Sequence, residues 1–293
     1  MLGLRDFPQK GLDVYNNTII MERPNNLLQI ASSLGCYTPQ AEKLSIAERA
    51  QKRVEILEVN RQKNIEDVLQ VAQNILQQDP SSTNENQIDR DWFTRVINNA
   101  QDVSDDEMKR MWGKVLAGEI KHPKLYSLRT LDVLRNMTKD DAKLIIDIAP
   151  YILRDFDDNV FVFNEEKDNG VIEFSKILYL MELGILDSNT TILINESFDG
   201  RVEDMSNEVR FWNQNIGLII KTNSTRLDFP AYDFTSIGKQ ILTLIDGIKP
   251  DTQFYESFLK IYSSNDIYCC GPIREGTFGK HFELESVIFE KSK

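Results

Sequence analysis

Apolar residues between positions 41 and 78 recur at the spacing of a helix. Their steps are three or four residues, apart from one step of eight that passes through Arg61, and the positions are Ile46, Ala50, Val54, Leu57, Ile65, Val68, Ala72 and Ile75. No proline or glycine interrupts the segment. One stripe of this kind predicts a single helix, roughly 55 Å long at about 1.5 Å per residue. Such a helix either packs along its own domain or pairs with a second copy of the chain.

Residues 89–156 carry the signals of four short helices joined by short turns. The expected N-terminal caps are Asp89 or Asp91 for the first helix, a capping box from Ser104 to Glu107, Ser127 for the third and Thr138 for the fourth. Apolar residues follow each cap at helical spacing, and among them we expect Trp112, Leu116 and Leu131 to be buried. Gly118 is expected either to end its helix or to allow close packing.

Residues 157–293 mix the two periodicities. Strands are expected at 160–163, 190–195, 216–221, 226–229, 267–270 and 282–289, and helices at 174–186 and after caps at Thr235 and at Asp251 or Thr252. The sequence therefore predicts an α+β protein in which a long N-terminal helix and a helical bundle precede a mixed α+β domain. A helix, a Leu-Gly-Ile-Leu stop and a β-ribbon are also how a winged-helix module begins, so that alternative stays open.

Breaks in the pattern divide the chain into four segments. We expect an N-terminal arm at 1–40, where Asn25–Leu34 forms a short helix, and the long helix with its linker at 41–88. The linker itself, 79–90, is rich in polar residues. The bundle at 89–156 and the C-terminal domain at 157–293 complete the division.

Charge is distributed unevenly over these segments. The chain carries 34 basic and 46 acidic residues, or −12 in all. Residues 89–156 hold twelve of each sign, whereas residues 157–293 hold 13 basic and 23 acidic residues. The acidic C-terminal half would repel a nucleic-acid backbone, so nucleic acid is not the favoured partner.

Composition also limits the cellular location of the protein and the kinds of site that it can form. Three cysteines without CxxC spacing and two histidines that lie 159 residues apart argue against a disulfide framework and against a metal site. No apolar run is long enough to span a bilayer, and the first residues lack the order of a signal peptide. We expect a cytoplasmic protein with no membrane contact, cofactor or metal.

Motifs in the bundle resemble a known family. They comprise Asp91-Trp92-Phe93, the run DVSDDEMKRMWGKVLAGEIKHP at 102–123, SLRTL at 127–131 and LRNMTKDDAKL at 134–144. Together they resemble an uncharacterised bacterial and prophage family known only as a domain of unknown function, and the segment 232–245 is similar to that family's C-terminal helix. The helix pair is also distantly similar to a family implicated in abortive infection by phage. The resemblance implies a role in phage–host conflict or prophage biology and supplies no catalytic residues.

Arg129 and Glu119 are the most informative residues of those motifs. Arginine in the first turn of a helix lies at the unfavourable end of the helix dipole. A carboxylate, either Glu119 or Asp132, is therefore expected to form a salt bridge with it. Alternatively, Arg129 is presented to a phosphate or an acidic partner. Together with Lys114, these two residues are the candidate interaction site.

The search for catalytic motifs is mostly negative. Phosphate-binding glycine loops and the nucleophile elbow are absent from the sequence. His122 is expected at the surface, and Cys269 and Cys270 on a strand. Asp157 or Asp158 followed by Glu165-Glu166-Lys167 resembles the acid and acid–x–lysine signature of metal-dependent nucleases, although the spacing is short for two strands. Glu283 and Glu285 share a strand face, as a magnesium site would require, but with 46 acids such pairs arise by chance.

These observations favour a non-enzymatic interaction or accessory protein that forms homo-oligomers through the long helix and also binds a protein partner. Two alternatives stay open. One is a metal-dependent nuclease that acts as an abortive-infection effector, and the other is a winged-helix regulator that binds DNA.

Overall fold

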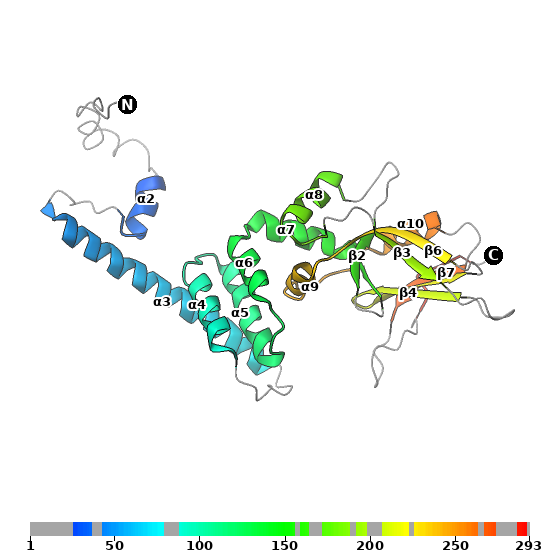
Figure 1. Cartoon of the computed structure of the whole chain (residues 1–293), viewed down its shortest axis with the longest axis horizontal. Helices are drawn as coiled ribbons and strands as arrows, with labels where there is room; N and C mark the ends of the chain where they lie inside the picture. The colour runs from blue at the N-terminus through cyan, green and yellow to red at the C-terminus, as the bar shows by residue number, and fades with distance from the viewer. Residues whose placement is uncertain are drawn as a thin grey trace, which may run out of the picture.

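The chain folds into an α+β structure, as the sequence predicts. The computed structural model describes residues 26–36, 43–78, 88–155, 159–163, 172–187, 192–197, 207–222, 226–262, 267–273 and 286–291. A long helix lies at one end, a helical bundle follows, and an antiparallel sheet lies at the other end (Figure 1).

The long helix is α3, Ile46–Gln78, and the short helix α2, Asn26–Ser33, precedes it. Both were predicted, but α3 begins five residues later than position 41. Ser45 explains the difference, because its backbone N–H donates to Glu48 Oε2 at 2.8 Å while its Oγ accepts from the Glu48 N–H at 3.3 Å. This capping box fixes the start of the helix after Ser45. The same hydrogen bonds lower the pKa of Glu48.

The bundle contains the four predicted helices: α4 Arg90–Ala100, α5 Asp106–Lys121, α6 Leu128–Asn136 and α7 Lys139–Ile148. Caps at Asp89, Ser127 and Thr138 are confirmed. The predicted capping box at Ser104 is wrong, since Asp105 caps α5 and accepts from the N–H groups of Glu107 and Met108. An ionised carboxylate is a stronger acceptor than a serine hydroxyl. The Asp105 carboxylate also pairs with Lys139 at 2.5 Å.

Helix α3 lies against α5 along its C-terminal half. Gly113 makes this approach possible, because a Cβ there would lie 2.4 Å from Val71 Cγ1. The buried Lys109 donates to Asp67 at 2.7 Å across the same contact and lowers the pKa of that carboxyl. Trp112, Leu116 and Leu131 are buried, as predicted.

The sheet has eight antiparallel strands in the order β3-β6-β2-β1-β4-β5-β7-β8 among the described residues. Their bounds are β1 Ile152–Arg154, β2 Val160–Phe163, β3 Ile192–Ser197, β4 Asn207–Asn213, β5 Ile216–Thr222, β6 Arg226–Asp233, β7 Ile267–Pro272 and β8 Phe289–Lys291. Three further helices accompany it: α8 Phe174–Glu182, α9 Ser236–Leu242 and α10 Thr252–Tyr262. From α10, Tyr255 and Phe258 pack with Leu218 of β5 in a second core beneath the sheet.

Several strands differ from the prediction. β1 is only three residues long, too short to show a period, and β4 was not anticipated. The β4–β5 hairpin turns through Gln214 and Asn215, with Gln214 at φ 51°, so the glycine that usually marks such a turn is missing. β8 covers Phe289–Lys291 rather than 282–289, and residues 274–285 lie outside the described part.

The ribbon expected of a winged helix forms in part. Gly184 takes φ +72° after α8, and Leu186 forms an isolated bridge with Phe234. β3 then pairs with β6, but β6 also pairs with β2. The ribbon is therefore the edge of an eight-stranded sheet, which is larger than a wing.

One core joins the bundle to the sheet. Val68 of α3, Trp112 of α5 and Leu180 of α8 belong to the same buried cluster as Val162 and Tyr232 of the sheet. The core therefore continues across position 156, where a segment limit was predicted from composition. Most of the predicted linker, 79–87, lies outside the described residues, and the three limits between the four segments remain predictions.

The close approach at Gly113 leads to the first prediction. In Gly113→Ala, the new methyl group overlaps Val71 and pushes α3 away from α5, which should lower the free energy of unfolding by about 1–3 kcal/mol. Removing the opposing methyls in Gly113→Ala/Val71→Ala should recover part of this loss. Urea unfolding of the single and double variants measures both effects. Equal stability of Gly113→Ala and the unmodified chain would contradict the packing described here.

Candidate interaction surface

The three predicted site residues do not form one site. Lys114 and Glu119 lie on α5 and Arg129 lies in the first turn of α6, but each has different surroundings. Glu119 is buried, Lys114 is half-buried and Arg129 is exposed. They are therefore considered one by one.

Glu119 holds the turn between α5 and α6. Its Oε1 accepts from the backbone N–H of Lys124 at 2.6 Å and its Oε2 from that of Tyr126 at 3.1 Å. The two carboxylate oxygens thereby satisfy two backbone amides of the turn, which is a structural role. The Tyr126 hydroxyl shares a hydrogen bond of 3.0 Å with Thr243, and burial raises the pKa of that tyrosine.

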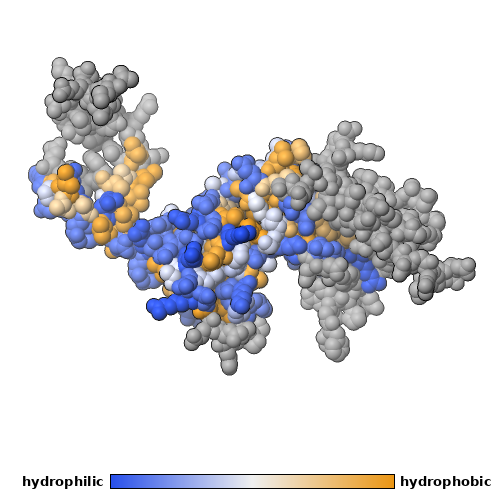
Figure 2. All heavy atoms as spheres, viewed as in Figure 1, coloured by the Kyte–Doolittle hydropathy of each residue, from blue (hydrophilic) through white to orange (hydrophobic). Residues whose placement is uncertain are grey.

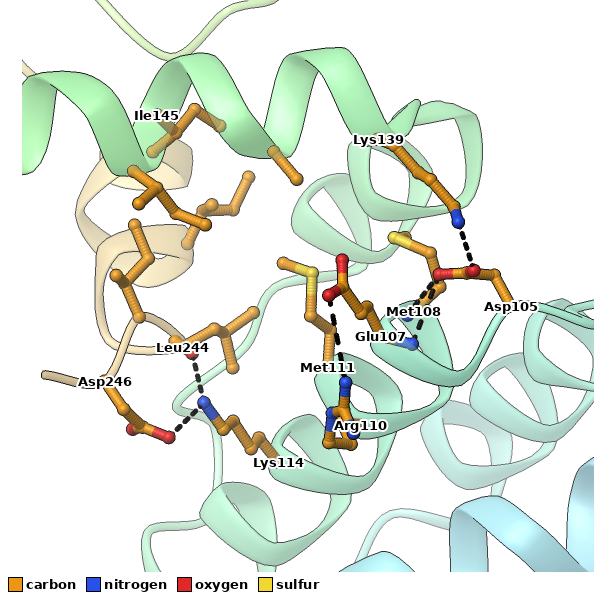
Figure 3. A pocket seen from close by; sticks show the side chains of 14 residues that line it. Asp105, Glu107, Met108, Arg110, Met111, Lys114, Lys139, Ile145, Leu244 and Asp246 are labelled. Carbon is orange, nitrogen blue, oxygen red and sulfur yellow. Dashed lines mark hydrogen bonds and ion pairs between the residues drawn. The ribbon is translucent and has the colours of Figure 1, made fainter.

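Lys114 connects α5 to the segment that follows α9. Its Nζ donates to the backbone oxygen of Leu244 at 2.6 Å and pairs with Asp246 at 2.5 Å (Figure 3). Residues more than a hundred positions apart are joined by this one side chain. Sequence spacing alone gave no sign of either partner.

Arg129 has no ion pair within the part of the chain that the structure describes. The expected bridge to Glu119 is wrong, because both Glu119 oxygens accept from backbone amides. Asp132, the other expected partner, lies one turn away and forms no ion pair with it among the described residues. Presentation of Arg129 to an acidic partner stays a prediction.

The candidate catalytic residues are mostly outside the described ranges. Residues 156–158, 164–171 and 274–285, which contain the nuclease-like acids and the pair Glu283 and Glu285, are not among them. Within the ranges that are described, no group of three or more histidine, cysteine or acidic side chains is placed to hold a metal ion. His122 is exposed at the end of α5, and Cys270 is buried in β7. None of the described helices is both long and apolar enough to cross a membrane.

The N-terminal half of α3, residues 46–60, carries an uncovered apolar stripe. Val68 and Ala72 on this stripe are buried by the bundle, whereas Val54 is 47% exposed and Ile46 77% exposed. Apolar colour lies over this part of the molecule in Figure 2. In the described part, side-chain hydrogen bonds between α3 and the bundle begin at Arg61, which donates to Asp102 at 2.8 Å. One face of one helix is therefore core at one end and surface at the other.

Helix α2 packs beside this half of α3. Gly35, at φ +69°, ends α2 in the left-handed conformation and lies so close that a Cβ there would be 2.8 Å from Arg53 Cα. Asn60 Nδ2 donates to the backbone oxygen of Ser33 at 3.2 Å. Leu27 and Ile30 of α2 are exposed nonetheless, as is Leu34 directly after the helix. The apolar surface of this end of the molecule thus comes from two helices.

Charge is polarised along the same segment. Residues 46–52 carry two basic side chains, Arg49 and Lys52, and one acidic one, Glu48. Residues 53–60 carry one basic side chain, Arg53, and two acidic ones, Glu55 and Glu58. The two ends of residues 46–60 are therefore of opposite net charge.

Helix α8 presents a second apolar face. Phe174 is 62% exposed and Leu178 is 50% exposed, and the only basic residue of the helix is Lys176. Tyr179 is partly tied down, since its hydroxyl donates to Asp141 at 2.7 Å. In a winged-helix protein α8 would face DNA, yet Lys176 is its only cation for binding phosphates.

The geometry of Glu119 and Arg129 leads to a stability prediction. Glu119→Gln replaces a buried acceptor oxygen by an amide group opposite an N–H donor, which should cost about 1–3 kcal/mol of unfolding free energy. Arg129→Gln should change it by less than about 0.5 kcal/mol, because the side chain is exposed. Urea unfolding of both variants and of the double variant should give additive losses. A coupling free energy of more than about 1 kcal/mol between the two positions would contradict this description, because it would indicate a salt bridge between Glu119 and Arg129.

Comparison with known proteins gives one match. The model of a family described as Protein of unknown function (DUF2806) matches residues 48–259, which include most of α3, the bundle and the helices α8, α9 and most of α10. No curated protein and no solved structure matches the chain. Because the match covers well over half of the 293 residues, the chain belongs to the DUF2806 family.

Proposed function

We propose that this protein is a non-enzymatic interaction protein that self-associates through residues 46–60 of α3. The observation that supports this proposal is the apolar stripe of α3, which Arg61 interrupts between Leu57 and Ile65. The bundle buries the stripe at Val68 and Ala72 but leaves it in solvent at Ile46 and Val54. A partner that covers the second part would complete the burial that the bundle begins.

Helix physics favours a partner for this segment. An isolated helix of about 15 residues is marginal in water, and most helices in proteins are stabilised by packing of their apolar face. Residues 46–60 have α2 on one side, at Arg53 and Asn60, but their stripe faces solvent at Val54. A second helix on the stripe would supply the missing packing.

A second copy of the chain is the partner that the charges favour. In an antiparallel pair, residues 46–52 of one copy lie beside residues 53–60 of the other. The net positive part then faces the net negative part twice, as two-fold symmetry requires. A parallel pair would place like charges together. The proposed dimer is therefore an antiparallel pairing of two α3 helices.

The alternatives have less support among the described residues. For the DNA-binding regulator, α8 offers one lysine and two exposed apolar side chains, and residues 157–293 carry a large acidic excess. The residues of the nuclease alternative, Asp157, Asp158 and 165–167, lie outside the described ranges. The interaction function is the better supported of the three.

A matched pair of substitutions tests the proposal. Val54 and Val59 lie on the same helix, five residues apart and thus about 140° apart around it, and both are exposed. Val54→Glu places a charge on the stripe and should raise the dimer dissociation constant at least a hundredfold. Val59→Glu places the same charge outside the stripe and should leave it within about threefold. Sedimentation equilibrium of the full chain measures both constants.

Two results would overturn self-association. One is an unmodified chain that stays monomeric up to high micromolar concentration. The other is an equal loss of dimer in both variants, which would place the contact elsewhere. Circular dichroism at a concentration at which the proteins are monomeric should show the same unfolding temperature for both variants, because neither side chain is buried in the single chain.

The role in phage–host conflict rests on the resemblance of the bundle motifs and stays part of the proposal. If the dimer carries that role, expression in a phage-sensitive bacterium should lower plaquing efficiency. Val54→Glu should then abolish the effect, while Val59→Glu should keep it. Unchanged plaquing with the unmodified chain across a phage panel would count against a defence role for the protein acting alone.

A further inference from the structure

A pocket lies between α5, α7 and the end of α9, away from residues 46–60 of α3. Its volume is about 320 Å³, which is within the lower range of sites for small molecules. Figure 3 shows side chains from the three elements converging on it. Nothing in the proposed self-association uses this pocket.

The walls of the pocket are mostly apolar. Met108 and Met111 come from α5, Ala142 and Ile145 from α7, and Ile241 from α9. Methionine side chains are flexible and polarisable, and they adapt to ligands of different shape. The pocket therefore offers an apolar chamber open to solvent on one side.

Hydrogen bonds fix the wall that α9 contributes. The Gln240 side chain accepts from the backbone N–H of Ser127 at 2.9 Å and also from the Thr130 hydroxyl. The Thr243 hydroxyl shares its hydrogen bond with Tyr126. Lys114 adds its bond to the Leu244 oxygen. A wall held in this way is preformed, so a ligand would not have to order it.

The charged groups differ in what they have left to offer. Asp105 is 28% exposed, and its oxygens already accept from the N–H groups of Glu107 and Met108 and pair with Lys139. Lys114 is 25% exposed and donates to Leu244 and Asp246. An ammonium has three N–H donors, so one of them is left for a ligand. Asp246 lies at the mouth, 79% exposed, where water also solvates it.

We propose that this pocket binds a small amphipathic carboxylate, whose apolar body fills the chamber and whose carboxylate accepts the third N–H of Lys114. A cationic ligand is disfavoured because Lys114, the least exposed of the charged side chains that line the pocket, is itself a cation. A neutral chain would fill the chamber but leave the ammonium without the extra acceptor. The surrounding bundle, residues 89–156, has no net charge to repel an anion.

Straight-chain carboxylates are suitable probes for the full-length protein. Isothermal titration with butanoate, hexanoate and octanoate should show affinity rising about fourfold for each added methylene until the chamber is full. Octanoate should bind at least tenfold more tightly than 1-octanol and octylamine. No measurable binding of octanoate, or preference for octylamine, would overturn the proposal.

Three substitutions locate the binding. Lys114→Met keeps the length of the side chain and should abolish the preference for octanoate over octanol while keeping the dependence on chain length. Lys143→Met changes an exposed lysine of α7 that does not line the pocket and should have no effect. Ala142→Leu fills the chamber and should weaken the binding of octanoate, 1-octanol and octylamine at least tenfold. This variant keeps the test valid if Lys114→Met fails to fold.

The result is independent of the dimer. Val54→Glu should bind octanoate as the unmodified chain does, so loss of self-association and loss of ligand binding are separable. Octanoate affinity that is unchanged in both Lys114→Met and Ala142→Leu would place the ligand outside this pocket and contradict the inference.

Discussion

The packing of α3 against α5 at Gly113 determines how the rest of the molecule is arranged. Because this position lacks a side chain, Val71 and the backbone of Val68 approach α5 directly, and Lys109 joins Asp67 across the same contact. The contact holds only the C-terminal half of a 33-residue helix. The other half must extend from the bundle, since a helix without proline or glycine in its interior does not bend back on itself. An uncovered apolar stripe is the direct consequence of this one-sided anchoring.

The bundle and the sheet form a common body to which α3 is attached. A single core runs from Val68 to Tyr232, and Lys114 ties α5 to the segment after α9. The arrangement separates two kinds of surface. Residues 46–60 of α3 offer an extended apolar line suited to another helix, whereas the space between α5, α7 and α9 is a small chamber with fixed walls. These two surfaces are consistent with the proposals that the protein binds a second copy of itself and a small ligand.

Local signals predicted most of the helices, because caps and apolar spacing act within a few residues. Thr138 and Ser127 cap where expected. Asp105 caps α5 in place of Ser104 and also pairs with Lys139, 34 positions away. The strand β4 was not predicted, because the turn that follows it contains no glycine. The role of Glu119 depends on backbone amides in a tertiary turn, and the exposure of the α3 stripe depends on where the bundle ends. Neither property is a function of spacing, so the sequence indicated the helix and its apolar face but not which half is covered.

Hydrogen–deuterium exchange along α3 tests the central claim most directly. Amides in residues 64–76, held by the bundle, should be protected at every protein concentration. Those in residues 49–60 should exchange quickly in dilute protein and become protected as concentration rises, because a partner then covers an otherwise marginal helix. Protection of residues 49–60 that does not change with concentration would contradict the account, since it would mean that the single chain already covers or stabilises this half of the helix.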